Sequence, residues 1–203
     1  MRVRFVCEGP LKIAAVLIAA LIWCAGARAA ESPPAPRNPQ TGLSIGVMQR
    51  LERAHWIPEG AREPARVVYV FTDPECPYCN KLWKALRSVR GADVQIRYLL
   101  VAVIDADSPG KDAAILEARD PAAALQSHEQ RYAQGGIPPR TKMLPATRET
   151  ISVNGDLMGA LHIYGTPGLV YLNEAGEVSV FSGVPDATQL QSIFGSRGSK
   201  PQD

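Results

Sequence analysis

Apolar runs and amphipathic stretches alternate along the chain, and this alternation predicts a mixed α/β domain. Residues 66–72 are mostly β-branched or aromatic, which is typical of a strand buried on both faces. A second apolar run at residues 94–104 predicts another buried strand, and helical spacing predicts a helix over residues 81–89 between them. We therefore expect a βαβ unit with parallel strands and a right-handed crossover. An amphipathic helix is expected over residues 43–54, ending before a break at residues 57–60.

After this unit the pattern becomes helical and then returns to strands. Ser108-Pro109 and Asp120-Pro121 each join a helix-capping residue to a proline at the first helical position, so we expect a helical insertion at about residues 105–164. Two short runs within residues 168–181 predict an antiparallel hairpin, and residues 186–194 predict a last amphipathic helix. The order predicts an α/β fold with helices on both sides of one sheet.

The first 29 residues have the features of an export signal that is cleaved from the mature protein. Basic residues precede an apolar run over residues 13–27, and small residues follow it. The run is about 15 residues long, whereas a membrane-spanning helix needs roughly 20. We expect cleavage after Ala29, and the alternatives are an uncleaved anchor and lipid attachment at Cys24.

The rest of the chain divides by composition into three parts. Residues 30–42 are rich in proline and small polar residues and predict a flexible linker. Residues 43–197 are long enough for one domain with a buried core, and residues 198–203 predict a disordered tail.

Removal of the signal also changes the charge, because that segment carries four basic residues and one acidic residue. The net charge falls from +2 for the full chain to −1 for the mature protein. A chain so balanced, without a stripe of lysine or arginine, argues against nucleic acid and anionic membranes as partners. We expect the partners to be proteins or small thiols.

The chemistry of the mature protein centres on one pair of cysteines. Cys76 and Cys79 are separated by two residues at the predicted start of a helix, close enough for a disulfide. Free backbone N–H groups and the helix dipole favour a thiolate at the first position, so Cys76 is expected to be the nucleophile and Cys79 the resolving thiol. Pro77 and Tyr78 between them are expected to tune the redox potential.

Other readings of this pair remain as alternatives. A structural zinc half-site needs two further ligands, and the chain offers three histidines and no second cysteine pair after the signal. An inert structural disulfide is the other alternative, although a bridge across one turn constrains little of the unfolded chain. We expect no metal and no cofactor. We expect His55 to be a capping or packing residue rather than a general base, and His128 and His162 to be surface or helix-face residues.

A second feature lies far along the chain at Thr166-Pro167. This proline immediately precedes a predicted strand, where it is awkward unless it begins the strand or occupies a cis turn. We infer a cis Thr166–Pro167 bond, against the alternative of an ordinary loop proline.

Together these segments resemble a known family. Residues 69–83, which contain Cys-Pro-Tyr-Cys, the helical insertion and residues 157–171 look like the catalytic domain of DsbC/DsbG-type periplasmic interchange proteins, and the Asp-Pro-x-Cys-Pro-Tyr-Cys form is most similar to the DsbG group. The resemblance implies a thioredoxin fold, a periplasmic location and the same roles for the two cysteines. It also implies that Thr166 and Pro167 form a loop that faces the disulfide and binds an extended substrate segment.

Two departures from the family pattern shape the expectations. About 35 residues separate the expected cleavage site from the first strand, too few for the N-terminal dimerisation domain of the family, so we expect a monomer without strong isomerase activity. Thioredoxin-like proteins often place a buried acid six residues before the nucleophile, and here Val70 stands there. A proton acceptor for Cys79 must then come from Glu75, water or elsewhere.

The leading hypothesis is therefore a periplasmic thiol:disulfide oxidoreductase that acts on protein thiols and disulfides. Its redox partner is expected to be a membrane thiol protein, and the direction of electron flow stays open. One alternative is a reductase of sulfenic acids on single-cysteine proteins, which uses the same thiolate. An alternative from another class is a thiol-based copper-binding or protein-binding module.

Overall fold

The computed structural model describes residues 39–195, so the expected signal segment, the tail and most of the linker lie outside the described residues. The elements of this part follow the predicted order of βαβ unit, helical insertion and ββα unit. They are α1 (Pro39–Arg53), β1 (Ile57–Gly60), β2 (Arg66–Thr72), α2 (Pro77–Val89), β3 (Val94–Leu100), α3 (Ser108–Leu116), α4 (Pro121–Gln130), the 3-10 helix η1 (Tyr132–Gln134), α5 (Pro145–Ala160), β4 (Gly168–Leu172), β5 (Val178–Ser182) and α6 (Ala187–Phe194).

The five strands form one mixed sheet in the order β1-β3-β2-β4-β5. β2 and β3 are parallel, which confirms the predicted βαβ unit, and Val70 lies opposite Tyr98 in their register. β4 pairs antiparallel with both β2 and β5, which confirms the predicted hairpin. Because Phe71 pairs with Gly168, the end of β2 lies beside the start of β4. The loop that follows β2 and the loop that precedes β4 therefore meet at the same end of these two central strands.

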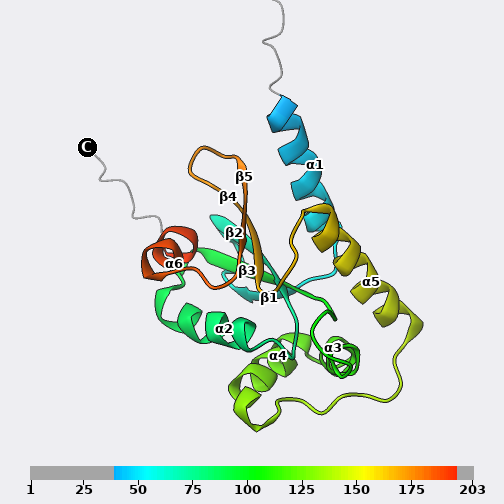
Figure 1. Ribbon diagram of the computed structural model, residues 1–203. Coiled ribbons are helices and arrows are strands. Elements are labelled where there is room, and N and C mark those ends of the chain that lie inside the picture. The colour runs from blue at the N-terminus through cyan, green and yellow to red at the C-terminus, as the bar shows by residue number, and fades with distance from the viewer. Residues whose placement is uncertain (1–38, 196–203) are drawn as a thin grey trace, which may run out of the picture. The chain divides into compact units, whose positions relative to one another are not determined.

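Alternate residues of β2 face two separate hydrophobic clusters, one on each face of the sheet. Val68 and Val70 pack with α2 and α6 in the first cluster, which also takes residues from α3 and α4. Tyr69 and Phe71 pack with α1 and α5 in the second. Figure 1 shows α2 and α6 on one side of the sheet and α1 and α5 on the other. This arrangement explains why β2 is apolar on both faces.

Three predicted boundaries were wrong. α1 begins at Pro39, so the last residues assigned to the flexible linker are helical. Residues 57–60, predicted as a break, form β1, which lies antiparallel to β3 at the edge of the sheet, where a proline is tolerated. β3 ends at Leu100 rather than at residue 104, because the amides of Val103 and Ile104 donate to the side chain of Asp73 instead of to a strand.

The predicted helical insertion consists of α3, α4, η1 and α5, and α3 packs against both α4 and α5. A tight turn follows η1 at Gly135 and Gly136, which both have positive φ. A side chain at Gly136 would collide with the ring of His128, so the turn brings the chain directly against α4. Within residues 39–195, no helix is both long enough and apolar enough to span a membrane.

Candidate active site

The two cysteines lie where the loop after β2 enters α2. Cys76 is the N-cap of α2 with extended backbone angles (φ −84°, ψ 113°), and Pro77 occupies the first helical turn. The sulfur of Cys76 accepts a hydrogen bond from the backbone N–H of Cys79 at 3.4 Å. Both side chains are free thiols and nearly buried, with exposed fractions of 2% and 3%. The predicted helix over residues 81–89 thus begins earlier, and both cysteines stand at its positive end.

The surroundings separate the acidities of the two thiols. A hydrogen bond from the Cys79 thiol, together with Thr166 and the backbone amides of Cys79 and Tyr78, lowers the pKa of Cys76 to about 6 against the opposing effect of burial. Burial, reinforced by the neighbouring Cys76, raises the pKa of Cys79 far above its ordinary value. At neutral pH the first sulfur is therefore a thiolate and the second a thiol.

Thr166, which precedes Pro167, lies against the first cysteine. The Thr166–Pro167 peptide bond is cis. When Cys76 is protonated, its thiol donates to the carbonyl oxygen of Thr166 across 3.2 Å. The hydroxyl oxygen of Thr166 is buried without a hydrogen-bond partner among the described residues, which leaves it available to the Cys76 sulfur, and Thr166 is one of the causes that lower the pKa of Cys76.

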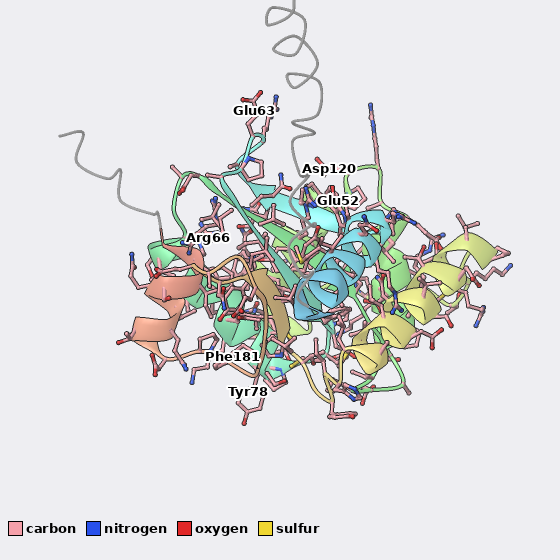
Figure 2. All side chains as sticks on the ribbon, turned by 90° about the horizontal axis from the view of Figure 1, so that it is seen from above. Glu52, Glu63, Arg66, Tyr78, Asp120 and Phe181 are labelled. Atoms are coloured by element: carbon pink, nitrogen blue, oxygen red, sulfur yellow. The ribbon has the colours of Figure 1, made fainter. Side chains whose placement is uncertain are left out.

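The two residues between the cysteines are the exposed part of the motif. Pro77 is exposed, and 61% of the surface of Tyr78 is open to solvent. Figure 2 shows the Tyr78 side chain projecting away from the ribbon. Its ring is an exposed aromatic surface, whereas the sulfur of Cys76 is buried.

Asp73, whose role was not predicted from the sequence, anchors the cysteine loop from within. This residue has no exposed surface, and its carboxylate accepts four hydrogen bonds. The backbone N–H of Glu75 and the hydroxyl of Ser108 donate to one oxygen at 2.8 Å each, and the amides of Val103 and Ile104 donate to the other at 2.7 and 2.9 Å. Asp73 therefore joins the cysteine loop to the end of β3 and the start of α3.

The expectation that His128 is a surface residue was wrong, because it is fully buried against the same loop. The backbone N–H of Ile137 donates to its Nδ1 at 3.1 Å, so the neutral ring carries its proton on Nε2, which donates to the carbonyl oxygen of Pro74 at 2.8 Å. Burial lowers the pKa of His128 and keeps this arrangement neutral. Tyr132 adds a hydrogen bond from its hydroxyl to the carbonyl of Glu75 at 2.9 Å. The helical insertion thus holds the backbone just before Cys76.

Glu75, one of the expected proton acceptors for Cys79, is engaged with a basic residue. The carboxylate of Glu75 forms an ion pair with Lys111 on α3, whose ammonium also donates to the carbonyl of Gly135 at 2.8 Å. A different acid, Glu129 on α4, is buried next to α2 and accepts a hydrogen bond from Asn80, the residue after Cys79. No pattern in the sequence separates Glu129 from the other acids of the insertion.

The remaining residues that the sequence analysis singled out lie elsewhere. His162 is exposed, as expected, whereas His55, which was expected to cap or pack, is exposed as well. Val70 is buried in β2, and because its side chain is aliphatic it supplies no acid beneath the cysteines. Within residues 39–195, no cluster of three or more histidine, cysteine, aspartate or glutamate side chains is arranged to hold a metal ion.

Comparison with known proteins agrees with this geometry. A family model described as a thioredoxin-like domain matches residues 59–196. The thiol:disulfide interchange protein DsbG of Pseudomonas aeruginosa is 36% identical over 165 residues, which cover 81% of this chain and 64% of that protein. The DsbG of Escherichia coli K12 is 38% identical over 158 residues, which cover 74% of this chain and 61% of that protein. The chain thus spans less than two thirds of these relatives, and the resemblance to DsbC/DsbG-type proteins is confirmed.

Solved structures confirm the thioredoxin fold. A periplasmic thioredoxin-like protein from Salmonella enterica serovar Typhimurium has a TM-score of 0.60 at 19% identity, covering 73% of this chain and 93% of that one. The catalytic domain of Proteus mirabilis ScsC has a TM-score of 0.60 at 22% identity, covering 74% of this chain and 93% of that one. At such identities the likeness concerns the fold.

Proposed function

Because the chain belongs to the thioredoxin-like domain family, we propose that it is a thiol:disulfide oxidoreductase that acts on protein thiols and disulfides. Cys76 is the nucleophile and Cys79 the resolving thiol. The observation that carries this proposal is the opposite shift of their acidities, since a pKa of about 6 makes Cys76 a thiolate at pH 7 while buried Cys79 keeps its proton. A structural disulfide needs no such asymmetry.

The proposed reaction proceeds by two exchange steps. The Cys76 thiolate attacks one sulfur of a client disulfide, which forms a mixed disulfide and releases the other client sulfur as a thiolate. Cys79 then loses its proton and attacks Cys76, which forms the Cys76–Cys79 disulfide and releases the reduced client. Run in reverse, the same steps oxidise a client dithiol, and the redox partner decides the direction.

The loop at Thr166 and Pro167 is proposed to bind the client next to the sulfur. The protonated thiol of Cys76 donates to the Thr166 carbonyl, and the thiolate has no proton to donate there. Once Cys76 is ionised, this carbonyl is free to accept from the backbone of an extended client segment, as in strand addition. The ring of Tyr78 is exposed, and we expect it to contact an apolar side chain of the client.

A catalysed exchange assay tests this function. We expect the mature protein to speed the reduction of insulin disulfides by a small thiol, and Cys76→Ser to lose this activity. Cys79→Ser retains the first step and therefore accumulates a mixed disulfide with insulin. Undiminished turnover by the Cys76→Ser variant would overturn the proposal.

We further propose that the protein is an exported, periplasmic monomer that exchanges electrons with a membrane thiol protein. The periplasmic protein from Salmonella with the same fold supports the location. N-terminal sequencing of protein from the periplasmic fraction checks the cleavage after Ala29, and light scattering checks the monomer. Trapping the thiols with acid in living cells reports whether the pair is held reduced or oxidised.

A further inference from the structure

The two-step reaction requires that charge appear and disappear on a sulfur in a nearly dry site. An acid on α4 is buried against α2, where it contacts the residue after Cys79 and is influenced by the charge of Cys76. We propose that Glu129 is a positioning residue whose buried carboxyl binds a proton when the Cys76 thiolate forms and releases it when Cys76 enters a disulfide. The inference rests on the proposed function, and it couples the redox step to the uptake and release of a proton by Glu129.

The geometry of Glu129 is fixed from both sides. Its side chain is 3% exposed, and its Oε2 accepts a hydrogen bond from Nδ2 of Asn80 at 2.7 Å. The same Nδ2 donates to the backbone carbonyl of Glu129 at 2.8 Å. Asn80 follows Cys79 on α2 and is itself buried, and His128 holds the adjacent turn of α4 against the loop before Cys76. The carboxyl therefore cannot swing into solvent without losing its hydrogen bond from Asn80.

The charged groups around this carboxyl come from several elements. Burial is the largest cause that raises the pKa of Glu129 to about 7, and the negative charge of Cys76 raises it further, whereas the hydrogen bond from Asn80 lowers it. Glu129 in turn adds to the raised pKa of two tyrosines that face it. The titratable groups whose charges interact with Glu129 are Cys76 at the N-cap of α2, Lys84 of α2, Glu59 of β1, Tyr98 of β3 and Tyr132 of η1.

Because the thiolate and the carboxylate repel each other, each favours the neutral form of the other. Reduction of the Cys76–Cys79 disulfide by two glutathione molecules forms one oxidised glutathione and releases two protons. One proton goes to Cys79, Cys76 remains a thiolate, and the second proton is divided between Glu129 and the solvent. When Cys76 becomes part of a disulfide again, the repulsion ends and Glu129 returns its proton.

The sign of the effect follows from this repulsion. Above about pH 7 the wild-type reduced state carries two buried negative charges, so removal of the carboxylate stabilises the thiolate form and makes the disulfide easier to reduce. Below about pH 6 the carboxyl is already neutral, and its replacement changes little. Glu129→Gln keeps an oxygen that can accept from Asn80, so the packing is preserved while the charge is lost.

The test is the equilibrium of the mature protein with reduced and oxidised glutathione between pH 5.5 and 8.5. We expect Glu129→Gln to shift the equilibrium toward the reduced protein by about three- to tenfold at pH 8 and by less than about twofold at pH 5.5. The matched control is Glu149→Gln, which removes an exposed carboxylate from α5 and is expected to follow the wild type at every pH. A ratio between Glu129→Gln and wild type that does not change with pH would overturn the inference.

Two further measurements keep the result interpretable. Infrared difference spectra of the wild type at pH 7 should show a protonated carboxyl that appears on reduction, and the absence of that signal also overturns the inference whether or not the variant folds. Ultraviolet titration of the Cys76 thiolate in the reduced protein needs no exchange reaction. If the wild type fails to turn over insulin, the proposed function is contradicted. A lower pKa of Cys76 in Glu129→Gln than in the wild type would still support the role of Glu129.

Discussion

Replacing Cys79 by alanine isolates the main interaction that makes Cys76 acidic. In the wild type the Cys79 thiol donates a hydrogen bond to the Cys76 sulfur, and this bond is the largest cause of the lowered pKa. The substitution removes the thiol and keeps the backbone N–H of residue 79, which lies 3.4 Å from the Cys76 sulfur. The remaining contact with Thr166 is also retained. The variant therefore tests one hydrogen bond within an otherwise preserved helix start.

The expected magnitude follows from the strength of a hydrogen bond to a charged acceptor. Such a bond contributes about 1.5–3 kcal/mol, and each pKa unit corresponds to about 1.4 kcal/mol. The pKa of Cys76 should therefore rise from about 6 to roughly 7–8. At pH 7 the thiolate fraction would fall from about nine tenths to between about one half and one tenth.

The assay is the pH dependence of thiolate absorbance, checked by the rate of alkylation with iodoacetamide. The single-cysteine variant gives one titration curve, and far-ultraviolet circular dichroism confirms that it is folded. Because the thiolate is the reacting form, the alkylation midpoint should move upward with the absorbance midpoint. A midpoint in Cys79→Ala that equals or lies below that of the wild type would refute the assignment of this hydrogen bond.

Three further predictions concern the groups that hold the loop. His128→Ala leaves a buried carbonyl and a partly buried amide without partners and should destabilise the protein by about 2–4 kcal/mol in urea unfolding, whereas exposed His55→Ala should change stability by less than about 0.5 kcal/mol. Ser108→Ala removes one of four donors to Asp73 and should cost about 1–3 kcal/mol in the same assay. Thr166→Val removes a hydroxyl that stabilises the thiolate and should raise the pKa of the nucleophile by about 0.5–1 unit in an ultraviolet titration.

The parts of the fold and site that the sequence could predict are those encoded by neighbouring residues. β2 is buried on both faces and reads as a continuous apolar run, and the spacing of Cys76 and Cys79 fixes them on one helical turn. The cis bond before Pro167 was also inferred from its position before a strand. Each of these features depends on a few consecutive side chains, so no knowledge of distant packing was needed.

The residues that escaped prediction act across long separations in the chain. His128 contacts a carbonyl 54 residues earlier, and Glu129 contacts Asn80 on a different helix. A histidine or a glutamate on a helix usually faces solvent, and their burial here follows from how the insertion packs against the loop. β1 escaped for a related reason, since a four-residue segment with a proline becomes a strand only beside the free edge of β3.

The most direct test of the central claim is to locate the mixed disulfide by mass spectrometry after a brief reaction with oxidised glutathione. The account predicts a persistent glutathione adduct on Cys76 in Cys79→Ala, a transient one in the wild type and none in Cys76→Ala. An adduct that forms equally fast on Cys79 in Cys76→Ala, or no adduct in any of the three proteins, would contradict it.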